Sequence, residues 1–209
     1  MTFVYLKHPF TMLVSGPTGS GKTFWVKKLI ENNQKFCLPP PERIVYCYGE
    51  YQTIFSSFKK TIFMPGLPDN LMEMFDGSKS EWLIIDDLMI ETANSKIVSE
   101  IFTKGSHHRN LSVILLVQNF FMRGKESRNI SLNSQYIVLF KNPRDQSIAT
   151  NIARQMFPTK IKKFQAVYED ATKDPFSYLF IDLKPATASN LCLLTDVFGQ
   201  KGHMIAYQL

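Results

Sequence analysis

The chain has 209 residues, of which 44% are hydrophobic and 20% are charged, and this balance excludes a disordered protein. No run approaches the ~18 apolar residues of a membrane span, and the first residues lack the layout of a secretion signal. The formal net charge of +6 favours a polyanionic partner such as nucleic acid, although basic proteins without that role are common. Three cysteines, Cys37, Cys47 and Cys192, form no C-x-x-C pair, as in proteins whose thiols stay reduced. We therefore expect one soluble intracellular domain over residues 1–209, without a membrane partner.

The first motif is a complete phosphate-loop pattern, G-x-x-x-x-G-K-[ST]. Its eight residues are Gly16, Pro17, Thr18, Gly19, Ser20, Gly21, Lys22 and Thr23. An apolar run over 10–14 predicts a strand before the loop, and the helical spacing of apolar residues over 24–30 predicts a helix after it. Such a loop binds phosphate with inward-facing N–H groups and the positive end of the helix. We expect Lys22 to contact the β- and γ-phosphates of ATP, Thr23 to contact Mg²⁺, and Ser20 to add a hydrogen bond within the loop. The alternative is a glycine-rich turn without a ligand.

Polar residues follow two later apolar strands. The predicted strand over 82–85 runs into Asp86 and Asp87, and the predicted strand over 113–117 runs into Gln118. Asp86 in this position would hold Mg²⁺, usually through water, and Asp87 would orient and deprotonate the attacking water, which indicates hydrolysis. Gln118 would hydrogen-bond both the γ-phosphate and that water. Two simpler interpretations remain open, namely that Asp87 caps the following helix and that Gln118 merely ends a strand.

The rest of the chain alternates between strand and helix patterns. Further strands are predicted over 44–48, 61–64, 135–140 and 178–183. Further helices are predicted over 51–60, 69–75, 94–104, 144–156 and 159–170. The triple proline at 39–41 predicts an extended connection. This alternation predicts an α/β fold, in which helices cover both faces of a mostly parallel sheet.

Two segments permit more than one interpretation. Residues 119–133 combine basic and aromatic side chains without a clean period, and this pattern suits either contact with a nucleic-acid backbone or a solvated loop. The adjacent His107 and His108 suggest a metal site, but no partner ligands occur at zinc spacing.

With these motifs in place, the chain resembles the FtsK/HerA superfamily of DNA-pumping ATPases. It is most similar to the short viral genome-packaging ATPases of Polinton/Maverick elements, adintoviruses and poxvirus-like large DNA viruses. Besides the phosphate loop, the segments that carry the resemblance are 8–10, 82–87, 107–113, 117–119, 128–133, 140–145 and 178–183. The resemblance covers about 8–185 and leaves 186–209 as a C-terminal extension.

The resemblance implies a P-loop NTPase fold of the RecA/FtsK-HerA type and a homo-oligomeric ring, commonly a hexamer. Such a ring threads double-stranded DNA into a preformed capsid using ATP, through contacts with the DNA backbone. An arginine of one subunit reaches the γ-phosphate held by its neighbour. Arg109 is the first candidate for that role and Arg128 the second. We expect neither the membrane anchor nor the DNA-recognition domain of larger members, so loading onto DNA would need a partner protein or the capsid portal. Asp87 also occupies the position at which members of the superfamily commonly have glutamate, whose side chain is longer by one methylene group.

A phosphate loop also occurs in three other classes of protein, which are alternatives here: a GTPase, a nucleotide kinase and a nucleotide-dependent scaffold protein. Residues 142–145 read N-P-R-D where a GTPase has N-K-x-D, but Pro143 replaces the lysine and no D-x-x-G follows Asp86. A small-molecule nucleotide kinase would have a lid rich in arginine, which is not evident. A nucleotide-dependent assembly or scaffold protein would keep the loop without using Asp87 as a base.

Overall fold

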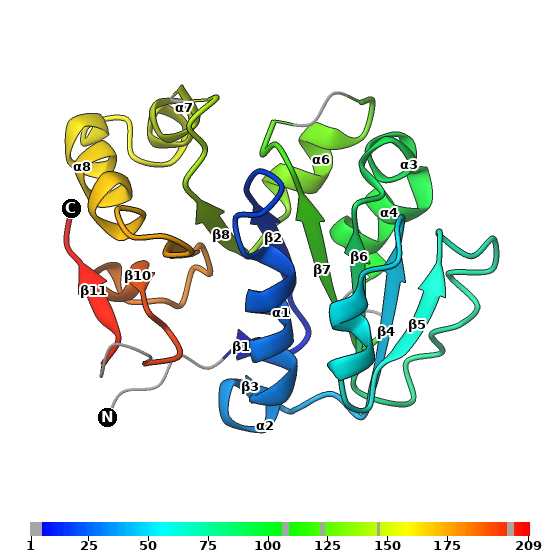
Figure 1. Ribbon diagram of the computed structural model, residues 1–209. Coiled ribbons are helices and arrows are strands. Elements are labelled where there is room, and N and C mark those ends of the chain that lie inside the picture. The colour runs from blue at the N-terminus through cyan, green and yellow to red at the C-terminus, as the bar shows by residue number, and fades with distance from the viewer. Residues whose placement is uncertain (1–5, 106–108, 122–123, 146, 200–202) are drawn as a thin grey trace.

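The computed structural model describes residues 6–105, 109–121, 124–145, 147–199 and 203–209. Its centre is a nine-stranded sheet with the order β11-β10-β9-β8-β2-β7-β6-β4-β5 (Figure 1). The strands are β2 (Thr11–Ser15), β4 (Arg43–Tyr48), β5 (Ile62–Pro65), β6 (Glu81–Asp86), β7 (Leu111–Val117), β8 (Tyr136–Phe140), β9 (Tyr178–Asp182), β10 (Leu193–Thr195) and β11 (Ile205–Tyr207). A separate parallel pair joins β1 (Leu6–Lys7) to β3 (Cys37–Leu38).

The sheet is mostly parallel, as the alternation of patterns predicts. The strands from β8 to β5 in this order pair in parallel, whereas β9, β10 and β11 are antiparallel to their neighbours. β7 lies between β2 and β6, and all seven of its residues are buried. Strands covered on both faces read as continuous apolar runs, which is why the run over 113–117 carries no alternation.

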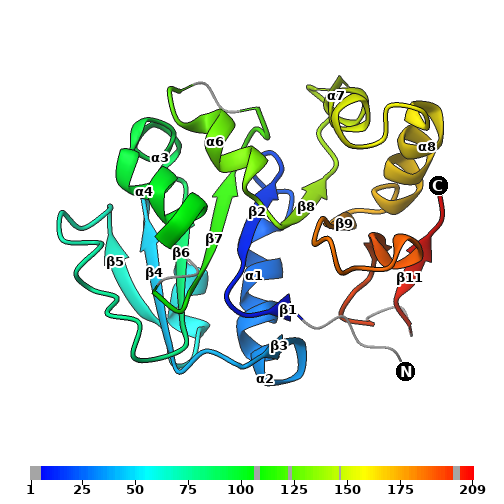
Figure 2. The ribbon, with the colours of Figure 1, turned by 180° about the vertical axis from the view of Figure 1, so that it is seen from behind.

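Helices cover both faces of the sheet (Figures 1 and 2). The helices are α1 (Lys22–Glu31), α2 (Asn33–Phe36), α3 (Met89–Asn94), α4 (Lys96–Glu100), α6 (Ser127–Leu132), α7 (Ser147–Met156) and α8 (Ile161–Ala171), with a π-helix at Ile101–Gly105 and 3-10 helices η1 (Thr53–Ser57) and η3 (Ser189–Leu191). One core cluster places α1, α2 and η1 on one face of the sheet. The other cluster places α4, α6, α7 and α8 on the opposite face. The fold therefore has three layers.

Several predicted elements are wrong in detail. The helix expected over 94–104 does form, as α4 and the π-helix that follows it directly, and Ser95 caps its start by accepting a hydrogen bond from the backbone N–H of Val98 at 3.2 Å. The separate helix α3 before it was not expected. The segment 51–60 holds only the short η1, and 69–75 forms turns rather than a helix. Conversely, α6 lies within the aperiodic 119–133, and the extension after 185 adds β10 and β11 to the sheet.

Candidate nucleotide-binding and hydrolysis site

The order of the strands brings the predicted site residues to one edge of the sheet. The phosphate loop follows β2, Gln118 follows β7, and Asp86 and Asp87 stand at the end of β6, which are three adjacent parallel strands. A cavity of about 540 Å³ is lined by the two aspartates, by Gln118, by residues 18, 19 and 21–23 of the loop and, on another side, by residues 50–54. Polar groups from distant parts of the chain therefore share one cleft at the carboxyl ends of the strands, the usual place for ligands in α/β sheets.

The loop has the conformation that a phosphate cradle requires. Gly21 adopts φ 101° directly before α1, a left-handed conformation that favours glycine. A Cβ at Gly16 would lie 2.6 Å from Ser20 Oγ and 2.7 Å from Phe140 Cβ, so no side chain fits there. The Ser20 hydroxyl is buried and has no hydrogen-bond partner among the described residues, so the predicted bond within the loop is not formed. A buried donor without a partner suits an incoming phosphate oxygen.

Lys22 lies folded over the loop. Its Nζ donates hydrogen bonds to the carbonyl oxygens of Gly16 at 2.6 Å and Pro17 at 3.1 Å. Burial lowers the pKa of the Lys22 ammonium, and the negative charges of Asp86 and Asp87 act in the opposite direction. A phosphate would offer this ammonium a charged acceptor, which binds it more strongly than a neutral carbonyl does.

The predicted metal ligands are in contact with each other. Thr23 Oγ1 donates to Asp86 Oδ2 at 3.3 Å, and the hydroxyl of Tyr46 donates to the same oxygen at 2.6 Å. Burial raises the pKa of the Asp86 carboxyl, while the hydrogen bond from Tyr46 and the charge of Lys22 oppose that shift. A hydroxyl and one carboxylate fit Mg²⁺, which takes oxygen ligands and usually adds phosphate oxygens and water to a few protein groups.

The described residues contain no cluster of three or more histidine, cysteine, aspartate or glutamate side chains that could hold a metal on its own. The suggested site at His107 and His108 lies outside the described residues.

Asp87 and Gln118 form a pair at the mouth of the cavity. Gln118 Nε2 donates to Asp87 Oδ1 at 3.0 Å, and both side chains are exposed. Asp87 has φ 57°, a left-handed conformation that aspartate and asparagine tolerate better than most residues. The residue that precedes α3 is Leu88, and the hydrogen bond described for the Asp87 carboxylate comes from Gln118 rather than from that helix. This geometry favours a role toward a ligand over a helix cap.

The two arginines lie in different surroundings, and neither lines the cavity. Arg109 precedes β7, so it lies at the edge of the sheet opposite the loop, where its Nη1 donates to the carbonyl oxygens of Met72 and, at 2.7 Å, Phe75. Arg128 is exposed in the first turn of α6. Arg109 thus fixes a turn of its own chain, whereas Arg128 is accessible. A role for either across a subunit boundary stays a prediction.

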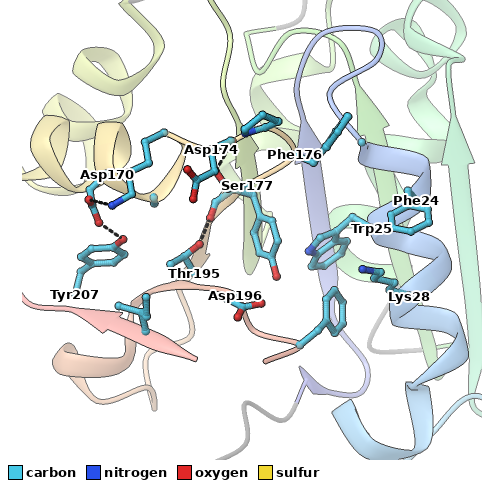
Figure 3. A pocket seen from close by; sticks show the side chains of 17 residues that line it. Phe24, Trp25, Lys28, Asp170, Asp174, Phe176, Ser177, Thr195, Asp196 and Tyr207 are labelled. Carbon is cyan, nitrogen blue, oxygen red and sulfur yellow. Dashed lines mark hydrogen bonds and ion pairs between the residues drawn. The ribbon is translucent and has the colours of Figure 1, made fainter. Parts of the chain in front are cut away.

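A second cavity, of about 780 Å³, was not predicted from the sequence. It shares Gly21 and Phe24 with the first cavity and extends between α1, the segment before β9, and β11 (Figure 3). Phe24 and Phe176 are 51% and 69% exposed at its rim. Phe176 has φ 61°, and its ring lies over Gly21, 3.2 Å from where a Cβ would be. The only sequence signal was an aromatic residue after Pro175 in the turn before a strand.

None of the helices that the structure describes is both long and apolar enough to cross a lipid bilayer.

No protein-family model matches the chain. No curated protein matches it either. Solved structures of the genome-packaging NTPase of Sulfolobus turreted icosahedral virus 2 do match. The complex with AMPPCP has a TM-score of 0.59 at 16% identity over 86% of this chain and 95% of that chain. The complex with ATP-gammaS has a TM-score of 0.57 at 13% identity over 96% of this chain and 97% of that chain.

A DNA-packaging ATPase from Sulfolobus turreted icosahedral virus gives a TM-score of 0.59 at 12% identity, over 96% of this chain and 98% of that chain. These identities are low, so the likeness concerns the fold. The chain has the α/β fold of a P-loop NTPase, with a mostly parallel sheet flanked by helices, and it shares this fold with a viral genome-packaging NTPase.

Proposed function

We propose that this protein is an ATPase that hydrolyses ATP to ADP and phosphate and uses the energy to move double-stranded viral DNA into a preformed capsid. One observation supports the hydrolysis. Lys22, the hydrogen-bonded pair of Thr23 and Asp86, and the hydrogen-bonded pair of Asp87 and Gln118 all line the same cavity. The shared fold with viral packaging NTPases supports the packaging role.

The loop and five side chains of the cavity have defined tasks in this reaction, namely Lys22, Thr23, Asp86, Asp87 and Gln118. The loop and Lys22 hold the β- and γ-phosphates, and Thr23 and Asp86 would hold Mg²⁺, which would supply positive charge to the phosphate oxygens. Gln118 orients a water molecule in line with the γ-phosphorus. Asp87 accepts a proton from that water as its oxygen bonds to phosphorus and the bond to the ADP oxygen breaks.

The second cavity gives the nucleoside of ATP a place to bind. Gly21 and Phe24 line both cavities, so an ATP molecule whose phosphates are bound in the loop would extend past these two residues into the second cavity. The rings of Phe24 and Phe176 stand at that junction and are largely exposed, so each offers apolar surface to a ligand (Figure 3). Stacking on aromatic rings holds bases of any identity. We place the base and ribose of ATP against these two rings.

Replacing Phe176 with alanine should weaken ATP binding about tenfold, because the base loses one stacking partner. Binding of inorganic tripolyphosphate, which has no base, should stay within about twofold of the original protein. Calorimetric titration of both ligands measures the two affinities. Leu132→Ala is the matched control, since it also truncates an exposed apolar side chain but lies outside both cavities. Equal losses for ATP and tripolyphosphate would show that Phe176 supports the loop rather than the base.

The proposal includes a homo-oligomeric ring of the Polinton/Maverick, adintovirus and poxvirus-like type, loaded onto DNA by the capsid portal or another capsid protein. In that ring, an arginine from one subunit completes the neighbour's site. The exposed Arg128 is available for this role, whereas Arg109 already donates to two carbonyl groups of its own chain. An Arg128→Ala protein that binds ATP normally but no longer hydrolyses it would support Arg128 in this role. Full ATPase activity of the Arg128→Ala protein would exclude Arg128.

The deciding experiment is steady-state ATP hydrolysis with and without long double-stranded DNA, at about 50 and about 200 mM salt. A DNA motor should be stimulated several-fold, and the stimulation should fade with salt, because backbone contacts release counterions. A rate of ATP hydrolysis that does not change when DNA is added would count against DNA as the substrate of the isolated protein. Absence of hydrolysis under all conditions would favour a nucleotide-dependent scaffold instead.

A further inference from the structure

Tyr46 is a buried phenol in contact with the predicted metal ligand. It lies in the middle of β4, pairs in register with Ile84 of β6, and has no exposed surface. Its hydroxyl donates to Asp86 Oδ2 at 2.6 Å, the length of a strong hydrogen bond to a carboxylate. Strand 44–48 was predicted only as a buried strand, so this contact was not foreseen from the sequence.

The two oxygens of the Asp86 carboxylate have different hydrogen-bonding surroundings. Tyr46 and Thr23 both donate to Oδ2, and no hydrogen bond described for Asp86 goes to Oδ1. Two donors on one oxygen fix the rotation of the carboxylate and keep the other oxygen available. A ligand of Mg²⁺ needs such a fixed orientation, because the ion demands near-ideal octahedral geometry.

The Tyr46 ring is itself held by an aromatic cluster. Its centroid lies 5.1 Å from that of Phe55, 5.7 Å from that of Phe58 and 5.1 Å from that of Phe63. Phe55 belongs to η1, directly after the residues 50–54 that form one wall of the phosphate cavity. The hydroxyl therefore has little freedom to leave Asp86, because moving the ring would disturb this packed cluster.

We propose that Tyr46 is the positioning residue of the metal site, which holds Asp86 by its Oδ2 so that Oδ1 would be left for the cation of a metal–nucleotide complex. This assignment rests on the proposed function, since it needs a nucleotide whose phosphates bring the metal to Asp86. Groups that orient a metal ligand typically contribute 10- to 100-fold to metal affinity.

The test is Mn²⁺ binding to the protein with ATP bound, followed by electron paramagnetic resonance at low temperature, where turnover does not interfere. Tyr46→Phe removes the hydroxyl and keeps the ring in its cluster. We expect the dissociation constant for Mn²⁺ to rise at least tenfold. ATP binding measured in excess EDTA should stay within about twofold, since no metal takes part. Tyr48→Phe is the matched control, because it removes a hydroxyl from the same strand and the same aromatic cluster.

Three results would overturn the assignment. Unchanged Mn²⁺ affinity in Tyr46→Phe would show that the hydroxyl does not position Asp86. Equal weakening of ATP binding with and without metal would assign Tyr46 to the shape of the cavity alone. If the original protein binds neither ATP nor Mn²⁺ with ATP, the proposed function itself fails, and this outcome is distinct because it appears before any substitution is made.

Discussion

Replacement of Lys22 by alanine should abolish tight ATP binding. The ammonium now donates to two loop carbonyls, 2.6 and 3.1 Å away, and would turn to the β- and γ-phosphates when a nucleotide enters. Each hydrogen bond between charged groups contributes about 1.5–3 kcal/mol, so the loss of two predicts a fall in affinity of roughly 100-fold or more. Titration with a fluorescent ATP analogue would measure it.

The control for this change is Lys27→Ala. Lys27 lies on the same helix and forms an i,i+4 ion pair with Glu31, so its loss removes an equal charge without touching the loop. Burial lowers the pKa of Lys22, which means that burying the charged ammonium costs free energy of folding. We therefore expect the Lys22→Ala protein to remain folded, which circular dichroism would test. Normal ATP affinity in a folded Lys22→Ala protein would contradict the assignment of the loop.

Asp87→Asn should keep ATP binding and stop hydrolysis. Asparagine has the shape of aspartate and also tolerates the φ of 57° at this position, so the backbone should not change. Its amide can still face Gln118, but it cannot take a proton from water. Loss of a general base typically lowers a rate by 10²–10⁴, so we expect turnover to fall by about that factor while affinity changes only a few-fold.

Rapid-mixing measurement of a single turnover, alongside equilibrium binding, separates the two effects. Glu91→Gln supplies a control, because it removes a neighbouring carboxylate that does not line the cavity. A normal single-turnover rate in Asp87→Asn would eliminate Asp87 as the base and leave Gln118 and the metal as the groups acting on the water.

The sheet was predictable because its strands carry long apolar runs, and the fold class followed from their alternation with helices. The failures occur where local signals compete. The short helix α3 ends at Asn94, directly before Ser95 caps the start of the predicted helix by accepting a hydrogen bond from Val98, and no separate signal for α3 was found in the sequence. β10 and β11 are short, and they owe their state to the pairing of β10 with β9 and of β11 with β10, which no local pattern encodes.

For the site, the sequence predicted the residues whose spacing along the chain defines their chemistry. The loop, Asp86 and Gln118 meet because strand ends in a parallel sheet share one edge. Tyr46 and Phe176 carry no such spacing. Tyr46 matters only because β4 pairs with β6, and Phe176 only because the turn before β9 lies over Gly21. These are products of tertiary structure.

The strand β7 has Gln118 after one end and the anchored Arg109 before the other. Seven buried residues span about 23 Å at ~3.3 Å each, and both neighbouring strands hold the backbone in register. Such a strand cannot slide along its axis without breaking the hydrogen bonds to both neighbours. The backbone at Gln118 and the turn that Arg109 fixes around Met72 and Phe75 therefore stay at a constant separation, and any response to loss of the γ-phosphate would be a movement of the Gln118 side chain and not of the strand.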